Sequence, residues 1–136
     1  MSKKALKIIP FIILFSLLNT LIGCSSPKIT PTSIQIKRLV FLNQSSKTLN
    51  NVRIYVTKTH EFASCGHILP KTECSTGFPL REYQGNSFDI SWSENGQNKS
   101  RHNIQAVVPV NINTEKPANA VITFGENEYF TASLIQ

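Results

Sequence analysis

Cys65 and Cys74 are separated by eight residues, and His60 and His67 lie near them in the sequence. Cysteine and histidine are ligands that zinc prefers, but these spacings match no zinc-finger or zinc-ribbon pattern. A redox-active pair usually takes the form Cys-x-x-Cys at the start of a helix, which is a much shorter spacing. The remaining alternatives are a disulfide within the chain and a disulfide between two chains.

Other side-chain combinations that carry catalysis are missing from the sequence. The chain has no Gly-x-Ser-x-Gly motif, no His-Glu-x-x-His motif and no glycine-rich phosphate loop. Asp89 is the only aspartate, and it alternates with apolar neighbours, so we expect it to face solvent. We therefore expect a protein that is not an enzyme and that has no metal site and no cofactor.

The first 24 residues have the pattern of an export signal. Three lysines within residues 1–7 precede an apolar run over residues 8–22. That run is shorter than the roughly 20 residues that a membrane-spanning helix needs. It ends in Leu21-Ile22-Gly23-Cys24, which resembles the lipobox of bacterial lipoproteins. The resemblance implies a helical signal peptide over residues 1–23, cleavage before Cys24 and acylation of Cys24.

A lipid on Cys24 would make the membrane a partner of this protein. One acyl chain holds a protein weakly at a membrane, whereas several chains together hold it stably. Ser25 follows the cysteine, and this resembles lipoproteins that Gram-negative cells pass to the outer membrane. We therefore expect a location in the cell envelope, with the periplasmic face of the outer membrane favoured over the inner membrane.

Two cysteines remain once Cys24 is assigned to the lipid. An even number of cysteines in an exported protein favours a disulfide, here between Cys65 and Cys74. Gly66 and the pair Pro70-Lys71 let the chain turn back between them. A closed loop of this length stabilises a fold by roughly 2.5–3 kcal/mol in the chain-entropy treatment.

The charge of the chain is less basic than its total suggests. The formal net charge is +6, but three of the 14 basic residues lie in the signal segment. The remainder carries 11 basic and 8 acidic residues, spread along the sequence. Nucleic-acid binding needs a concentrated basic surface, so we expect no nucleic-acid partner.

The segments after the signal peptide differ in composition. Residues 24–33 contain Cys24, two prolines and several hydroxyl residues, which predicts a flexible tether. Residues 34–136 are rich in Ile, Val, Thr and Phe, which predicts a single β domain. The chain is too short for two large domains.

Apolar and polar residues alternate in several short runs, as half-buried strands require. The expected inward positions include Ile34, Ile36, Val40, Leu42, Val52, Ile54, Val56, Phe88, Ile90, Trp92, Ile104, Ala106 and Val108. The polar segment 43–51 is expected to be a hairpin loop, and Asn95-Gly96 a tight turn. A further hairpin is expected between residues 120–124 and 129–135.

Six or seven such strands predict an antiparallel β-sandwich that resembles immunoglobulin domains, with a small open barrel as the alternative. Residues 39–56 resemble the first hairpin of small extracytoplasmic β-sandwich domains. The stretch from Cys65 to Trp92 resembles small lipoproteins of Gram-negative bacteria that have no known catalytic residues.

Phe78, Arg81 and Tyr83 are the candidate partner-binding residues. Aromatic side chains and arginine are enriched at binding hot spots, and these three follow the proposed disulfide. The alternative is purely structural: an edge strand whose ladder Pro79 interrupts, followed by a turn at residues 84–86.

These patterns predict a membrane-anchored, non-catalytic envelope protein that binds another envelope protein or supports an assembly. A module that binds glycan or lipopolysaccharide is the first alternative, and it would need an exposed aromatic platform. A small hydrolase or redox protein is the least favoured, since its motifs are missing.

Overall fold

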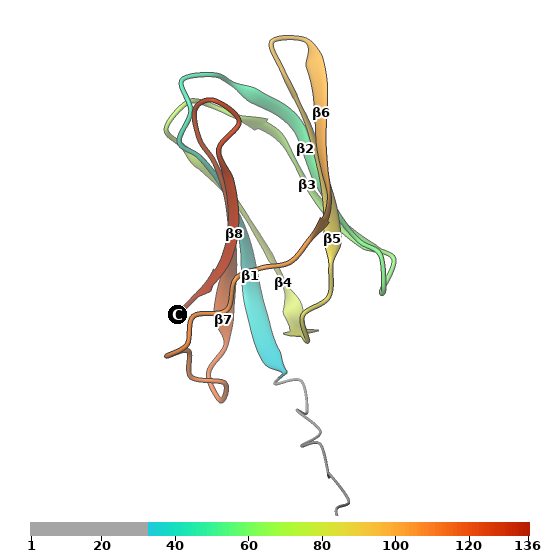
Figure 1. Cartoon of the computed structure of the whole chain (residues 1–136), viewed down its shortest axis with the longest axis vertical. Helices are drawn as coiled ribbons and strands as arrows, with labels where there is room; N and C mark the ends of the chain where they lie inside the picture. The colour runs from blue at the N-terminus through green and yellow to red at the C-terminus, as the bar shows by residue number, and fades with distance from the viewer. Residues whose placement is uncertain (1–32) are drawn as a thin grey trace, which may run out of the picture. The chain divides into compact units, whose positions relative to one another are not determined.

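The computed structural model describes residues 33–136, except for the side chains of residues 78–80 (Figure 1). The expected signal peptide, the expected lipidated Cys24 and the tether up to residue 32 lie outside these residues. No helix within residues 33–136 is long and apolar enough to cross a membrane.

The described chain forms eight strands. Their bounds are β1 Ile34–Asn43, β2 Leu49–Val56, β3 Glu61–Ile68, β4 Glu73–Tyr83, β5 Phe88–Glu94, β6 Gln97–Ile104, β7 Ala118–Phe124 and β8 Phe130–Ile135. The structure has eight strands, whereas six or seven were expected. The unexpected strand is β3, whose outward positions carry Phe62, Ser64 and Gly66, so its alternation is weak in the sequence.

The strands form two four-stranded sheets that face each other as a sandwich (Figure 1). We call the sheet with the order β4-β1-β7-β8 sheet A, and the sheet with the order β3-β2-β5-β6 sheet B. All pairs are antiparallel except β1 and β7, which run parallel. The predicted all-β sandwich is therefore confirmed, and the sheets do not close into a barrel.

The first polar loop is not a hairpin, which corrects the sequence prediction. β1 belongs to sheet A and β2 to sheet B, so residues 44–48 carry the chain from one sheet to the other. The prediction failed because a short polar loop is equally compatible with both connections.

An irregularity in β1 changes which residues face the core. The pairing of β1 with both neighbours shifts between Ile36 and Arg38. A bulge of one residue moves the following side chains to the opposite face. Leu39 and Phe41 therefore enter the main core. Val40 is buried, as expected, but it is not part of that core, and Leu42 is only half-buried.

The main core lies between the sheets and is centred on aromatic rings. Trp92 is buried as expected, with its ring centroid 5.1 Å from Phe124 and 6.4 Å from Phe130. The expected inward positions Val52, Ile54, Phe88 and Ile90 are buried, and Val56 is partly buried against the same core. Edge-on and stacked aromatic pairs add to the stabilisation from area burial alone.

The Asn95-Gly96 turn forms as predicted. Both residues have positive φ, at 51° and 75°, and Glu94 pairs with Gln97 across the turn. The following strand ends earlier than expected, at Ile104. Ala106 is only partly buried and Val108 is exposed, so the inward prediction for Val108 is wrong.

Candidate functional site

The segment that carries the candidate binding residues Phe78, Arg81 and Tyr83 lies in β4, at the edge of sheet A. Its pairing with β1 passes from Gly77 to Arg81 across a shift in register. Residues 78–80 thus bulge at Pro79, as the structural alternative predicted for an edge strand.

Arg81 and Tyr83 both make contacts within the domain. Nη2 of Arg81 lies 3.0 Å from Oε1 of Glu61, an exposed ion pair between β4 and the start of β3. The Tyr83 hydroxyl donates to the carbonyl of Ala106 at 3.1 Å and accepts the Ala106 N–H at 2.9 Å. Burial raises the pKa of Tyr83. Tyr83 therefore fixes the segment after β6, whereas Arg81 stays accessible to a ligand.

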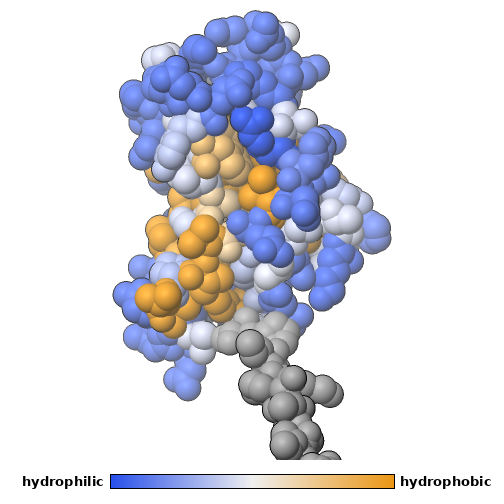
Figure 2. Space-filling model, viewed as in Figure 1, coloured by the Kyte–Doolittle hydropathy of each residue, from blue (hydrophilic) through white to orange (hydrophobic). Residues whose placement is uncertain are grey.

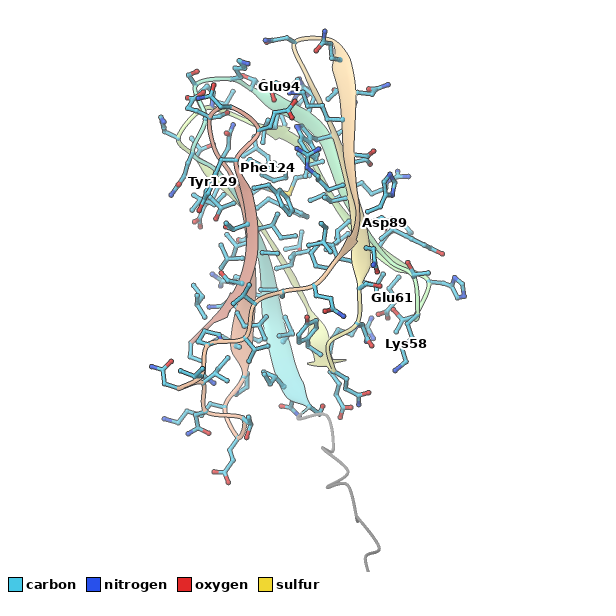
Figure 3. The ribbon with its side chains drawn as sticks, in the orientation of Figure 1. Lys58, Glu61, Asp89, Glu94, Phe124 and Tyr129 are labelled. Atoms are coloured by element: carbon cyan, nitrogen blue, oxygen red, sulfur yellow. A yellow bond between two sulfur atoms is a disulfide. The ribbon has the colours of Figure 1, made fainter. Side chains whose placement is uncertain are left out.

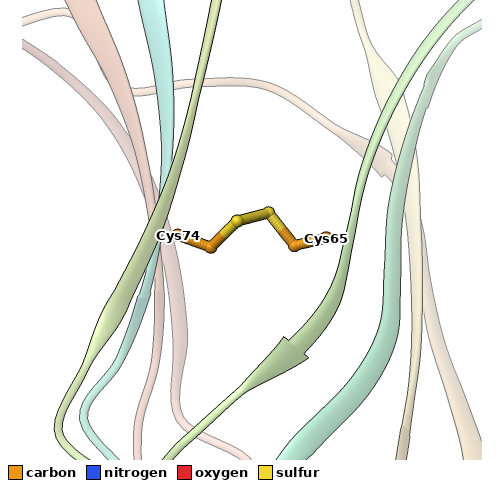
Figure 4. Close-up of a disulfide and its surroundings, with 2 residues drawn as sticks. All are labelled: Cys65 and Cys74. Atoms are coloured by element: carbon orange, nitrogen blue, oxygen red, sulfur yellow. A yellow bond between two sulfur atoms is a disulfide. The ribbon is translucent and has the colours of Figure 1, made fainter.

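Cys65 and Cys74 are joined as a disulfide, with their Cα atoms 6.5 Å apart (Figure 4). Cys65 lies in β3 of sheet B and Cys74 in β4 of sheet A. The bond therefore links the two sheets through one pair of edge strands. Its sulfur atoms are not available as metal ligands in this state.

The two nearby histidines bind other side chains. Nδ1 of His60 lies 2.7 Å from the Tyr55 hydroxyl, and Nδ1 of His67 lies 2.5 Å from Oδ1 of Asn50. Across residues 33–136, no three His, Cys, Asp or Glu side chains gather in a way that could hold a metal ion.

The solvent-facing side of sheet B contains a polar hollow that the sequence prediction did not identify. Its volume is about 540 Å³, and small polar side chains from all four strands line it, among them Asn51, Ser64, Ser91, Ser93, Asn98 and Ser100. Arg53 and Lys99 add positive charge to its lining. The signal in the sequence was the alternation of Asp89, Ser91 and Ser93 with the apolar residues of β5, which indicates a polar outer face.

An aromatic pair lies beside this hollow. Phe62 is 68% exposed, and Tyr55 is its cross-strand neighbour and is also exposed. The guanidinium carbon of Arg53 lies 5.6 Å from the centre of the Phe62 ring, within the range of a cation–π contact. Sequence reasoning placed most aromatic residues in the core and so did not find this platform.

Asp89 is partly exposed on the same sheet (Figure 3). Its Oδ1 accepts the Asn103 N–H at 2.9 Å, and its Oδ2 lies 3.2 Å from Nδ1 of His102. The hydrogen bond from the Asn103 N–H is the largest of the effects that lower the pKa of Asp89, and the hydrogen bond with His102 is the next largest. A carboxylate with a lowered pKa stays ionised at neutral pH, so Asp89 has no proton to donate as a general acid there and is a weaker base than an ordinary carboxylate.

An apolar patch covers part of the loop between β6 and β7. We define it as Val107, Val108, Val110 and Ile135; all four are exposed, Val107 at 67% and Val110 completely. Val107 joins the edge of β8 through hydrogen bonds with Ala132 and Leu134. Figure 2 shows apolar surface gathered on the side that carries β8 and this loop.

Comparison with other proteins identifies no family for this chain. No protein-family model matches it, and no curated protein matches it significantly. A solved structure described as the NMR structure of the protein from Eubacterium rectale is similar over 81% of this chain and 93% of its own, with 10% identity and a TM-score of 0.43.

Proposed function

We propose that this protein is a non-catalytic binding module of the bacterial cell envelope, anchored by a lipid on Cys24. Its domain is an immunoglobulin-like sandwich, and its partner is another envelope protein. The fold proposal is supported by two facing sheets, a disulfide between them and a buried tryptophan. Both cysteines precede Trp92, which differs from the Cys-Trp-Cys order of antibody domains.

The apolar patch is the observation that carries the proposal of a protein partner. Soluble proteins rarely leave neighbouring valines and isoleucine so exposed unless another surface covers them. The backbone under the patch is held by the hydrogen bonds of Val107 to β8. A fixed apolar surface loses little entropy when it binds, which suits a protein interface.

The place of the patch also suits a tethered module. Ile112, in the same loop, packs against the buried cluster that contains Ile34, the first residue of β1. The patch therefore lies toward the end of the domain where the expected tether joins it. Nine extended residues span at most about 30 Å, so the partner would lie close to the membrane.

A photo-crosslinking amino acid at position 110 tests this proposal in intact cells. We expect a discrete adduct with one envelope protein, identified by mass spectrometry, because Val110 is the most exposed residue of the patch. The same amino acid at the exposed position 58, in the turn between β2 and β3, is the matched control. Equal or absent adducts at the two positions would contradict a partner at the patch.

The anchoring proposal has a separate test. A Cys24→Ser variant should keep its signal peptide and lose the lipid, because the sulfur that carries the first acyl group is gone. Metabolic labelling with a fatty acid and membrane fractionation measure both effects. Unchanged processing and unchanged labelling would remove the lipid anchor from the proposal.

A glycan-binding role is the second candidate, and the polar hollow on sheet B supports it. Serine and asparagine side chains offer the donors and acceptors that sugars need, and Phe62 with Arg53 supplies a platform for stacking. Phe62→Ala removes the platform beside the hollow and should abolish retention on immobilised lipopolysaccharide, whereas Leu69→Ala, at an exposed site that is not part of the platform, should not. Equal retention of both variants would reject this role.

A further inference from the structure

A second cavity, of about 400 Å³, lies between the two sheets. Apolar side chains from both sheets line its interior, among them Ile36, Ile54, Phe88, Ile122 and Leu134. Protein interiors are normally packed with few voids larger than a water molecule. A cavity of this volume, lined mainly by apolar groups with a few polar ones, has the character of a small-molecule site.

The cavity follows from the side chains at inward positions. Alanines from both sheets and from the segment after β6 line it: Ala63, Ala106, Ala120 and Ala132. Elsewhere in the sandwich the same space is filled by Trp92 and the phenylalanine rings around it. The distance between packed sheets is nearly fixed. The sheets therefore cannot close the space that small residues on facing strands leave.

The cavity reaches the surface between β3 and β4. These strands are the edges of different sheets and make no backbone ladder with each other. Glu61 and Phe62 of β3 lie on one side of the opening, and Gly77 and Arg81 of β4 on the other. The Arg81–Glu61 ion pair crosses this opening. An exposed pair of this kind contributes little stability, so a ligand can displace it.

Two polar groups of the lining are available to a ligand. Oγ1 of Thr76 is buried and has no hydrogen-bond partner within residues 33–136, which is uncommon for a buried hydroxyl. Arg81 contacts Glu61 through Nη2, and its guanidinium carries further N–H groups that can bind a carboxylate. The lining thus combines an apolar interior with one cation, Arg81, that lies at the opening together with Glu61 and Glu82, and an entering carboxylate must replace Glu61 on Arg81.

We propose that this cavity binds a medium-chain fatty acid. The hydrocarbon chain lies between the sheets, where its burial supplies most of the affinity. The carboxylate stays at the opening on Arg81. This site contains no residue of the apolar patch, so it does not depend on the proposed protein interface; it shares Ser64 with the polar hollow and Phe62 with the platform beside that hollow.

The test uses the full chain in phospholipid nanodiscs and a dodecanoate that carries a diazirine. After irradiation, mass spectrometry should locate the label in peptides of β1, β7 and β8, the strands that supply much of the lining. Unlabelled dodecanoate should compete at least fivefold better than dodecanol, because only the acid can bind Arg81. Label spread evenly over the surface would overturn the proposal.

Variants distinguish binding in the cavity from binding elsewhere on the protein. Ala120→Phe fills the cavity and should reduce labelling about tenfold, whereas Thr123→Phe adds the same ring to the same strand outside the lining and should not. Arg81→Gln, at an exposed site, should fold normally and remove the preference for acid over alcohol. Undiminished labelling of a folded Ala120→Phe protein, or an unchanged preference in Arg81→Gln, would reject the assignment.

Discussion

Asn43 is the most completely buried polar residue of the described domain. Its amide nitrogen lies 2.8 Å from the carbonyl oxygen of Lys47 and 3.0 and 3.1 Å from those of Ile68 and Leu69. Its Oδ1 accepts the N–H and the hydroxyl of Ser45 at 3.0 and 2.7 Å. One side chain therefore holds the loop after β1 against the turn between β3 and β4.

Replacing Asn43 should destabilise the fold. Asn43→Ala should lower the free energy of unfolding by about 2–4 kcal/mol, because it leaves buried carbonyl and N–H groups without partners. Urea unfolding monitored by Trp92 fluorescence measures the change. The exposed neighbour in Gln44→Ala is the control and should change stability by less than about 0.5 kcal/mol. Similar losses in both variants would show that Asn43 is not the organising residue.

Tyr83 makes the second prediction at this scale. Tyr83→Phe should cost about 1–2 kcal/mol, because the backbone of Ala106 loses its partner in both directions. The folded protein raises the pKa of Tyr83 above its ordinary value of 10.0. Its contribution is therefore complete below pH 10 and is lost as the pH rises through the folded-state pKa.

The difference in unfolding free energy between wild type and Tyr83→Phe measures this pH dependence. Titration of lysines and of the other tyrosines is common to both proteins and cancels in the difference. The difference should be constant at neutral pH and should shrink in strongly alkaline solution. A difference that grows with pH would contradict the assigned direction of the pKa shift.

Charged side chains connect three turns at one end of the sandwich. Glu94, beside the β5–β6 turn, lies 2.8 Å from Nζ of Lys47 in the β1–β2 loop and 3.4 Å from Nζ of Lys99. Lys99 and Arg101 also reach Glu128 in the β7–β8 turn, each at 3.4 Å. The network joins elements of both sheets that are distant in the sequence.

Glu94 should make the free energy of unfolding decrease at acid pH. The hydrogen bond from Lys47 is the largest of the effects that lower its pKa below the ordinary value of 4.5. Its contribution is present above pH 4.5 and is lost as the pH falls through the folded-state pKa. Glu94→Gln should cost about 0.5–1 kcal/mol at neutral pH and less at pH 3. An equal cost at both pH values would contradict this account.

The sequence predicts local features of these elements better than their pairing. The Asn95-Gly96 turn and the alternation of Phe88, Ile90 and Trp92 were predictable, because both depend on neighbouring residues. The β1 bulge was not, since it is set by pairing with β4 and β7. Its effect, the inward turn of Leu39 and Phe41, depends on strands far along the chain.

The candidate sites follow the same division. The exposure of Arg81 was predictable from its residue type, while its role in binding stays a prediction. The pairing of Cys65 with Cys74 was predictable from the number of cysteines. The cavity and the polar hollow could not be predicted, because each combines residues from several strands of an unknown order. Ala120 and Ser91 carry no functional signal until the sheets are in place.

The two sheets of the described domain are connected unevenly. The Trp92 cluster and the disulfide connect them in one region, while the alanine-lined cavity separates them in another. The disulfide joins β3 to β4, the two edge strands that also border the cavity opening. It therefore limits how far these edges can separate when a ligand enters.

Removal of the disulfide tests this picture of the molecule. The double variant Cys65→Ala and Cys74→Ala should lose about 2.5–3 kcal/mol, because its unfolded chain gains the entropy of an open loop. Amide hydrogen exchange should increase first in β3 and β4, whose edges are then free to separate, while the β5–β6 hairpin keeps its protection. The oxidised wild type under the same conditions is the reference. Uniform loss of protection across both sheets would show that the disulfide stabilises the fold as a whole and has no special effect on the cavity opening.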